Sequence, residues 1–321
     1  MTPENFACKV EELEQQLSRV IVGQEDLVRS VLLGLLSEGH VLLEGVPGLG
    51  KTLLLKTLGD ALGVAFGRIQ FTPDLMPADI IGTNVLKGDG FSFHRGPVFA
   101  NVVLADEVNR ATPKTQSALL EAMQEHQVTL SGVTHPLPRP FFVMATQNPI
   151  EMEGTYPLPE AQLDRFLFKV LVPFPPQDDI VGILERTTGT EVVEVKPVLG
   201  REDLIDMLAL VRETPVGSHL LGYAATLISA THPDSPLAPE RVKTYVRYGA
   251  SPRGAQAMIL GSKARTLVEG RTHVTTDDIH FTAPLALRHR LVLGYEAAVD
   301  GVSADDLVAD VLEAHPAPTV D

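Results

Sequence analysis

Up to about residue 40, apolar residues follow a helical period. In Val10–Val20 they recur every three or four positions with Glu and Gln between them, and a second amphipathic stretch covers Asp26–Glu38. This spacing predicts two helices, each of which buries one face.

After residue 40 the pattern changes to short apolar runs that alternate with helical segments. The runs are rich in Val, Leu and Phe and are bounded by Gly, Pro or Asp, which is typical of strands buried on both faces. Helices between such strands indicate βαβ units and a parallel sheet covered on both sides. The predicted strands are Val41–Leu43, Phe66–Phe71, Asn101–Ala105, Phe141–Thr146 and Leu167–Val172.

Two short hairpins interrupt this regular scheme. One covers Ile80–Arg95 and turns at Asp89-Gly90, and the other covers Gln127–Leu137 and turns at Ser131-Gly132. A plain parallel α/β sheet needs neither of them.

A Pro-rich stretch, Val172–Gln177, predicts a domain boundary. We therefore expect an α/β domain at residues 1–172 and a mostly helical domain, with its linker, at residues 173–321. Helix starts in the second domain are marked by a Ser or Thr cap followed by Pro or by an acid three residues later, at Ser251-Pro252, Thr275–Asp278 and Ser303–Asp306.

The composition excludes several classes of protein. With 321 residues, 44% hydrophobic and 21% charged, the chain is long and apolar enough to bury a sizeable core, so it is not intrinsically disordered. Its 26 basic and 41 acidic residues give a net charge of −15, which argues against constitutive binding to nucleic acid or to an anionic membrane.

The single cysteine, Cys8, allows no intrachain disulfide and no cysteine-based zinc cluster. The N-terminal segment lacks an apolar core of the signal-peptide kind, and no apolar run is long enough to span a bilayer. We therefore expect a cytoplasmic protein. Ten histidines occur without ligand spacing, so no metal is expected beyond one carried by a nucleotide.

A glycine-rich loop follows the first predicted strand and leads into the helical run Leu53–Leu62. It fits G-x-x-x-x-G-K-T in the strand–loop–helix context that this motif requires. Its backbone N–H groups and the helix N-terminus would surround phosphate oxygens, the lysine would reach the β- and γ-phosphates of ATP, and the threonine hydroxyl would ligate Mg²⁺. The loop consists of Gly45, Val46, Pro47, Gly48, Leu49, Gly50, Lys51 and Thr52.

Polar residues end two other predicted strands. Asp106 and Glu107 follow the run Val102–Ala105, where Asp106 can hold Mg²⁺ and Glu107 can polarise an attacking water. Asn148 follows the strand Phe141–Thr146 and is placed to orient that water. Alone, the acids would cap a strand–helix turn and Asn148-Pro149 would be a turn, but beside a phosphate loop the catalytic interpretation is favoured.

These motifs resemble those of the AAA+ ATPases. More specifically, Asp106–Glu125, Ala145–Pro149 and Leu158–Phe166 resemble the MoxR subfamily, and the resemblance extends from about Val22 to about Leu291. It implies an αβα P-loop NTPase core with strand order 5-1-4-3-2, a C-terminal helical lid and a ring oligomer, usually a hexamer. In this family the two hairpins correspond to a helix-2 insert, here at about 74–97, and a pre-sensor-1 hairpin at about 127–137.

The resemblance also implies residue roles. Lys51 and Thr52 match Walker A, Asp106 and Glu107 match Walker B, and Asn148 matches sensor 1. The remaining matches are Arg165, the arginine finger that completes a neighbouring subunit's site; Arg253, sensor 2 on the lid; and Gly23 and Gln24, near adenine.

Three arginines can also be interpreted from their sequence neighbours alone. Arg165 could pair with Asp164 or with a nearby Glu, whereas Arg110 could be a second interface arginine or only part of a surface ion pair. Arg253 in the first turn of a helix gains nothing from the helix dipole, so a phosphate partner would explain it.

These features predict a MoxR-type ATPase that binds ATP and Mg²⁺ and remodels, assembles or activates a partner complex. The resemblance implies a client that often carries a von Willebrand factor A domain. A nucleotide-gated scaffold with negligible turnover is the alternative from another class. A DNA-directed motor is disfavoured by the charge of −15 and by the absence of an added nucleic-acid-binding module.

Overall fold

The computed structural model describes residues 1–317 except 47, 88–89, 150–153 and 190–192. The chain divides into two compact units. An α/β unit comprises Lys9–Leu158 and Val170–Asp206, and a helical unit comprises Met1–Cys8, Pro159–Lys169 and Met207–Asp321. The segment before the predicted boundary at residue 172 thus belongs partly to the helical unit, and the segment after it belongs partly to the α/β unit.

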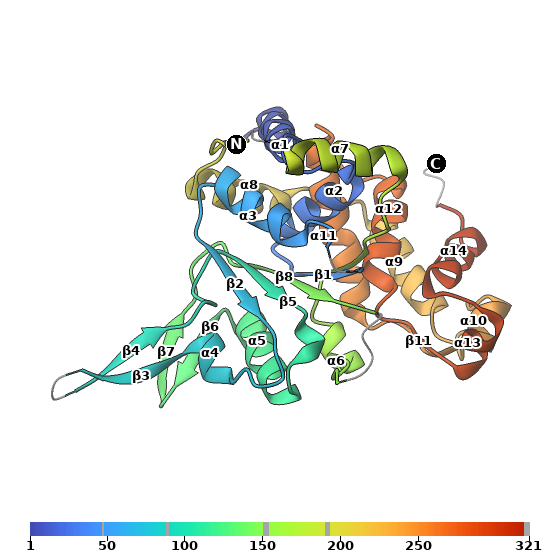
Figure 1. Cartoon of the computed structure of the whole chain (residues 1–321). Helices are drawn as coiled ribbons and strands as arrows, with labels where there is room; N and C mark the ends of the chain where they lie inside the picture. Colours follow the sequence, from blue (N-terminus) through green and yellow to red (C-terminus); the bar gives the residue numbers. More distant parts are fainter. Residues whose placement is uncertain (47, 88–89, 150–153, 190–192, 318–321) are drawn as a thin grey trace. The chain divides into compact units, whose positions relative to one another are not determined.

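A five-stranded sheet forms the centre of the fold (Figure 1). The β2–β5, β5–β8 and β8–β1 pairs are parallel. The order β2-β5-β8-β1-β9 becomes 5-1-4-3-2 when only these strands are numbered along the chain, which confirms the predicted fold class. The strands are β1 (Val41–Glu44), β2 (Phe66–Gln70), β5 (Val102–Asp106), β8 (Phe142–Gln147) and β9 (Phe168–Leu171).

Helices cover both faces of this sheet, with α2 and α3 on one side and α5 on the other (Figure 1). The central strands β5 and β8 are buried almost throughout because apolar helix faces pack on each side. The helices of this unit are α2 (Glu25–Leu36), α3 (Lys51–Ala61), α4 (Pro77–Ile81), η1 (Val108–Arg110), α5 (Pro113–Glu125) and α7 (Gln177–Thr188). Two others, α1 (Pro3–Ser18) and α8 (Arg201–Glu213), contribute residues to both units.

Both predicted hairpins are present and lie side by side (Figure 1). The first pairs β3 (Gly82–Lys87) with β4 (Gly90–Arg95), and the second pairs β6 (Gln127–Leu130) with β7 (Val133–Pro136). Ser131 and Gly132 both have positive φ, as a two-residue hairpin turn requires. Asp89 of the other predicted turn lies outside the described residues. The Phe93 ring stacks on His135 at 4.0 Å, so the two hairpins support each other.

The helical unit contains the predicted helix starts. Ser251 caps α11 by accepting a bond from the Arg253 N–H, and Ser303 and Thr275 form capping boxes with acids three residues later. Its elements are α6 (Glu160–Leu163), α9 (Ser218–Ala230), α10 (Glu240–Tyr245), β10 (Val246–Tyr248), α11 (Pro252–Val268), α12 (Thr276–Leu287), β11 (Val292–Leu293), α13 (Tyr295–Asp300) and α14 (Ala304–Ala314).

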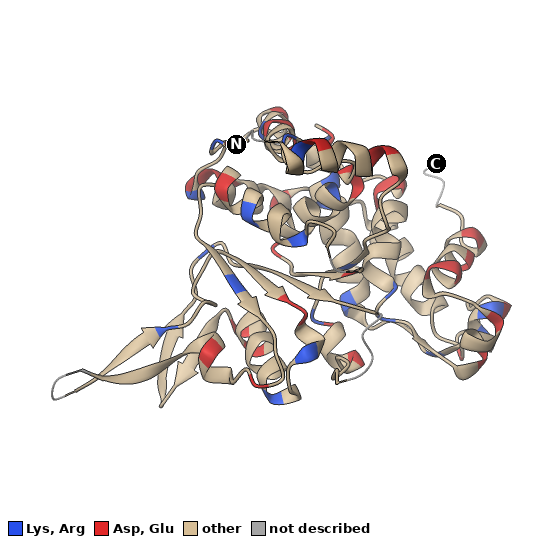
Figure 2. Ribbon diagram, viewed as in Figure 1, with Lys and Arg blue, Asp and Glu red and all other residues tan. Residues whose placement is uncertain are grey.

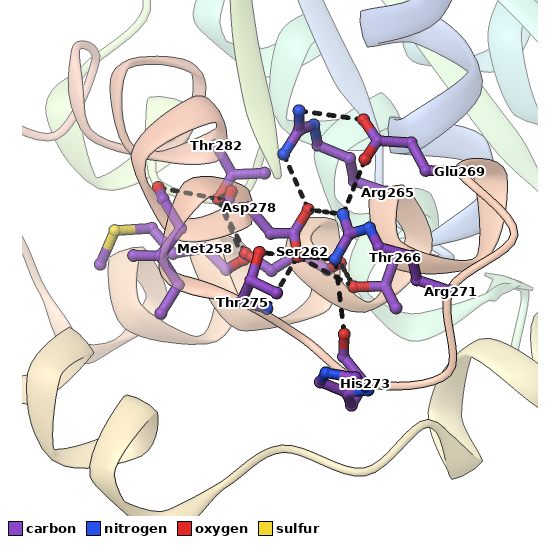
Figure 3. A network of polar contacts seen from close by, with 11 residues as sticks. Met258, Ser262, Arg265, Thr266, Glu269, Arg271, His273, Thr275, Asp278 and Thr282 are labelled. Carbon is purple, nitrogen blue, oxygen red and sulfur yellow. Dashed lines mark hydrogen bonds and ion pairs between the residues drawn. The ribbon is translucent and has the colours of Figure 1, made fainter. Parts of the chain in front are cut away.

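A fully buried carboxylate, that of Asp278, holds α11 and α12 together (Figure 3). Its oxygens accept bonds from Arg265 and Arg271 and from the Thr266 hydroxyl, besides the bonds from Thr275 in the capping box. Burial alone would raise the pKa of this group, but the hydrogen bonds from Arg271 and Thr275 outweigh it, and the pKa is lowered. Asp278 is therefore a charged but fully satisfied part of the core.

Within the described part of the chain, no helix combines the length and the apolar character needed to cross a bilayer.

Candidate functional site

A pocket of about 390 Å³ lies at the carboxyl ends of the central strands of the α/β unit. Ligands of open parallel sheets bind at this edge, since the strand ends and the following loops meet there. The glycine-rich loop, the two acids at the end of β5 and the residues at the end of β8 all reach it. Its lining consists of Gly45, Gly48, Leu49, Gly50, Lys51, Thr52, Leu53, Arg68, Asp106, Glu107, Thr146, Gln147 and Asn148.

The glycines shape the loop that runs from β1 to α3. Gly48 and Gly50 have φ of +85° and +72°, values that L side chains rarely adopt. A Cβ on Gly45 would lie 2.8 Å from the Cβ of Val172, so a side chain is excluded there as well. The loop therefore presents backbone rather than side chains to the pocket. Pro47 of the predicted motif lies outside the described residues.

Lys51 begins α3 and lines the pocket. Its ammonium group donates a hydrogen bond to the Gly45 carbonyl oxygen. Burial lowers its pKa, and the nearby carboxylates Asp106, Glu107 and Glu44 oppose that effect. A cation at the N-terminus of a helix, where the helix dipole also attracts anions, gives this end of the pocket the charge that a phosphate group requires.

Asp106 ends β5 and is held from both sides. The Thr146 hydroxyl donates to its Oδ1 at 2.8 Å, and the Arg68 guanidinium on β2 donates to its Oδ2 at 2.8 Å. Asp106 is therefore fixed in orientation while facing the same pocket as the Thr52 hydroxyl. A carboxylate and a hydroxyl are oxygen donors of the kind that Mg²⁺ prefers, so these residues fit a nucleotide-bound Mg²⁺.

Glu107 has a left-handed backbone with φ of +56°, which is uncommon for a residue with a side chain. Its N–H donates to the Thr146 hydroxyl at 2.8 Å, which supports this conformation. Its carboxylate accepts bonds from Gln70 at 3.0 Å and from Arg110 at 2.9 Å. Arg110 thus forms an ion pair with Glu107, which is one of the two roles expected for it. Strain at this position is typical of a functional residue.

Asn148 follows β8 and is 7% exposed at the edge of the pocket. Asn109 donates to its carbonyl oxygen at 3.4 Å, and the preceding Gln147 donates to the Glu44 carboxylate. The segment after β8 is thereby tied both to β1 and to the turn after β5.

Gly23 and Gln24 precede α2. Gly23 has φ of +63°, and a Cβ there would coincide with the carboxyl group of Asp179. The Gln24 amide donates to the Leu49 carbonyl oxygen at 3.3 Å, which connects this segment to the phosphate loop. The structure therefore brings the predicted adenine-proximal segment next to the loop.

Arg165 and Arg253 belong to the helical unit. Arg253 occupies the first turn of α11, half-exposed, and donates to Asp164 at 3.5 Å. Arg165 lies in the turn after α6, partly exposed, and its side chain makes no hydrogen bond or ion pair with the residues that the structure describes.

The sequence-based prediction lacks the lining residues Arg68 and Thr146, which donate to Asp106, and Gln147, which donates to Glu44. It also lacks Gln70, which donates to Glu107. Each belongs to a strand of the central sheet, where the hydrophobic pattern predicts a strand but assigns no role to its polar members. Side chains alternate between the two faces of a strand, so Arg68 and Gln70 of β2 lie on the same face. This alternation is the sequence signal that could have found these two residues.

Family models match both parts of the chain. Residues 40–168 match the ATPase family associated with various cellular activities (AAA), and residues 238–311 match the AAA lid domain. The chain is 46% identical over 322 residues to Chaperone MoxR1 of Mycobacterium tuberculosis, covering 99% of this chain and 85% of the relative. The chain belongs to the MoxR family of AAA+ ATPases.

Other MoxR-family relatives match along nearly their whole length. The uncharacterized protein YeaC of Bacillus subtilis is 43% identical over 311 residues, which is 95% of this chain and 93% of the relative. Protein MoxR of Methylorubrum extorquens is 30% identical over 341 residues, which is 95% of this chain and 94% of the relative. A crystal structure of a provisionally assigned ATPase from Cytophaga hutchinsonii has a TM-score of 0.93 and 38% identity, covering 99% and 97%. The predicted family and fold are confirmed.

Proposed function

We propose that this MoxR-family protein hydrolyses Mg²⁺-bound ATP to ADP and phosphate, and that hydrolysis drives chaperone-like remodelling, assembly or activation of a partner protein complex. One observation carries the ATPase part of this proposal. Lys51, Thr52, Asp106, Glu107 and Asn148 line one pocket, although up to 97 residues separate them in the sequence.

In this proposal the loop Gly45–Thr52 binds the phosphates through its backbone N–H groups, and Lys51 contacts the β- and γ-phosphates. Gly23 and Gln24 lie near the adenine. The Gln24–Leu49 hydrogen bond supports this assignment, because it places the two segments in contact.

Mg²⁺, when bound with ATP, neutralises charge that develops on the phosphate oxygens. Thr52 and Asp106 are the residues that would hold it. Asp106 already carries a bond from Thr146, so its orientation needs little change, whereas its ion pair with Arg68 must be shared or broken.

Glu107 polarises the attacking water and Asn148 orients it, so the chemistry depends on positioning and charge rather than on a covalent step. For this role the Glu107 carboxylate must leave Gln70 and Arg110, which hold it in the structure. We propose that Arg165 acts as the finger toward a neighbouring subunit and that Arg253 acts as sensor 2. The side chain of Arg165 is uncommitted among the described residues, which supports a partner from another copy.

The proposal includes a hexameric ring, a cytoplasmic location and a client with a von Willebrand factor A domain. It includes no nucleic-acid partner and no membrane insertion. Support for excluding nucleic acid comes from the net charge of −15 and from acidic residues spread over many helices (Figure 2), among them Asp305, Asp306, Asp310 and Glu313 on α14.

A nucleotide-gated scaffold with negligible turnover is the second candidate function. The observation that favours it is the engagement of the Glu107 carboxylate, which already accepts hydrogen bonds from Gln70 and Arg110.

The test is steady-state ATP hydrolysis per protomer over a wide range of protein concentration, for wild type and for Glu107→Gln. We expect specific activity to rise and reach a plateau as subunits assemble, and Glu107→Gln to bind ATP while losing about 100-fold or more in turnover. Glu121→Gln, an exposed residue of α5, is the matched control and should retain activity. Full turnover by Glu107→Gln would contradict the role of Glu107, and negligible turnover by wild type at every concentration would favour the scaffold.

A further inference from the structure

The segment that carries Arg165 is embedded in the helical unit. Residues Pro159–Lys169 group with Met207–Asp321, although the last two of them begin strand β9 of the sheet. Phe166 and Phe168, which follow Arg165 in the chain, are fully buried, and a Cβ on Gly261 of α11 would lie 2.4 Å from the Phe168 ring. Packing this close leaves the segment little freedom to move independently of α11.

A buried arginine just after α12 fixes this segment by polar contacts. The Arg290 side chain is 3% exposed, and its guanidinium donates to the carbonyl oxygens of Asp164, Phe166 and Leu167 at 2.7–3.2 Å. Its Nε donates to the Asp164 carboxylate at 2.8 Å, and a further bond goes to the Ala286 carbonyl oxygen. The planar guanidinium of Arg290 therefore bonds the residues on both sides of Arg165.

Among the residues that the structure describes, three side chains of the helical unit donate to the Asp164 carboxylate. Besides Arg290, it accepts bonds from the Ser251 hydroxyl at 2.9 and 3.0 Å and from Arg253 at 3.5 Å. Ser251 caps α11, and Arg253 is in its first turn. The contact with Arg253 is the longest of the three, and the Arg253 side chain is half-exposed, so it is the contact that exchanges partners most readily.

We propose that Asp164 and Arg290 are positioning residues that hold the Arg165 finger against helices α11 and α12. This inference rests on the proposed function. Whenever Arg253 leaves Asp164 for a phosphate, Asp164 loses one of its three donors. Nucleotide bound to one subunit thereby changes how firmly the Arg165 of that subunit is positioned. This Arg165 is the one that completes the site of the neighbouring subunit.

Mixing two inactive variants tests one step alone, namely whether Arg165 of one subunit completes the ATPase site of another. Arg165→Ala retains its own acids and lacks a finger, whereas Glu107→Gln lacks its own catalytic acid and retains a finger. A mixture of the two should recover ATPase activity, because Glu107→Gln subunits complete the sites of Arg165→Ala subunits. The test variant is Glu107→Gln combined with Asp164→Asn, and its matched control combines Glu107→Gln with Asp310→Asn, which weakens the exposed Arg241–Asp310 pair of the same unit.

We expect the Asp164→Asn combination to bind ATP and assemble like Glu107→Gln, and to recover about 10- to 100-fold less activity in the mixture, since a misplaced catalytic group costs about that much. The Asp310→Asn combination should recover full activity. Recovery by the Asp164→Asn combination equal to that of Glu107→Gln would overturn the proposal. Absence of recovery even with Glu107→Gln, in a protein whose wild type is active, would overturn it too while leaving the ATPase assignment intact.

If Asp164→Asn lowers the melting temperature, a milder variant tests the positioning role of Asp164 instead. Ser251→Ala, again with Glu107→Gln, removes the hydroxyl bonds to Asp164 and an N-cap, whereas Ser303→Ala removes the N-cap of α14 and a hydroxyl bond to Asp306, with no effect on Asp164. We expect several-fold weaker recovery with Ser251→Ala than with Ser303→Ala, and equal recovery would overturn the proposal. Wild type without turnover at any concentration would instead contradict the proposed function, and this inference with it.

Discussion

Arg68 on β2 and Asp106 on β5 form an ion pair, with Nη2 and Oδ2 2.8 Å apart, in the pocket at the carboxyl ends of the central strands. The two residues are 38 positions apart and meet because β2 and β5 are neighbours in register, with Arg68 opposite Leu104 and Gln70 opposite Asp106. The pair places a second cation, besides Lys51, against the carboxylate proposed to hold Mg²⁺.

Arg68→Ala should therefore lower the Mg²⁺ concentration that gives half-maximal ATPase activity. The arginine competes with the metal for Asp106, but it is about half-exposed, so we expect a change of at most about fivefold. A Mg²⁺ titration at saturating ATP measures this, with Arg139→Ala, which breaks the exposed Arg139–Glu38 pair, as the control. A higher Mg²⁺ requirement in Arg68→Ala would show that Arg68 assists the metal or the phosphates instead.

Gln70→Ala should raise basal turnover by a few-fold without changing the KM for ATP. The Gln70 amide holds the Glu107 carboxylate at 3.0 Å. Without it, Arg110 is the one side chain among the described residues that must be displaced before Glu107 can act on water. Steady-state kinetics check this prediction. Combining Gln70→Ala with Glu107→Gln should abolish the gain, and a gain that survives in the double variant would mean that Gln70 acts elsewhere.

Asp278→Asn should destabilise the helical unit by about 3–5 kcal/mol, because an amide NH₂ would face donors around a fully buried site. The pKa of Asp278 is lowered in the folded protein, so its contribution is present above the unfolded pKa of about 4 and is lost as pH falls through the folded pKa. Urea unfolding at pH 7, followed by circular dichroism, measures the cost. Asp277→Asn, in the same first turn and exposed, should cost less than about 1 kcal/mol.

Because of His40, the folded protein should lose stability as the pH is lowered from about 6.5 to about 4. Burial lowers its pKa to about 4, its Nε2 bonds the Met123 carbonyl oxygen, and its Nδ1 accepts the Val143 N–H, so the folded protein holds the ring neutral. The unfolded chain binds the proton more tightly. The free energy of unfolding therefore decreases by about 3 kcal/mol as the pH is lowered across this window. His40→Gln should flatten the pH dependence of urea unfolding, whereas His94→Gln, on an exposed hairpin strand, should leave it unchanged.

The sequence was sufficient to predict features that depend on local pattern or on a recognisable motif. The buried strands, both hairpins, the caps at Ser251 and Ser303 and the glycine-rich loop each reside in a few consecutive residues. The strand order followed from the resemblance to a family and not from periodicity, since hydrophobic runs do not reveal which strands are neighbours.

Contacts between distant residues escaped prediction for the same reason. Arg68 and Gln70 reach the acids after β5 only because β2 pairs with that strand, and Arg290 reaches Asp164 across 126 positions. No local signal distinguishes Arg290 from an arginine that ends a helix on the surface. The division of the chain, in which residues 159–169 join the helical unit, depends on such contacts.

The lone cysteine, Cys8, lies exposed on α1. A thiol-reactive dye would consequently attach at one defined point per protomer, with no competing site elsewhere in the sequence. The number of photobleaching steps from one labelled assembly then reports its number of subunits without any substitution in the chain.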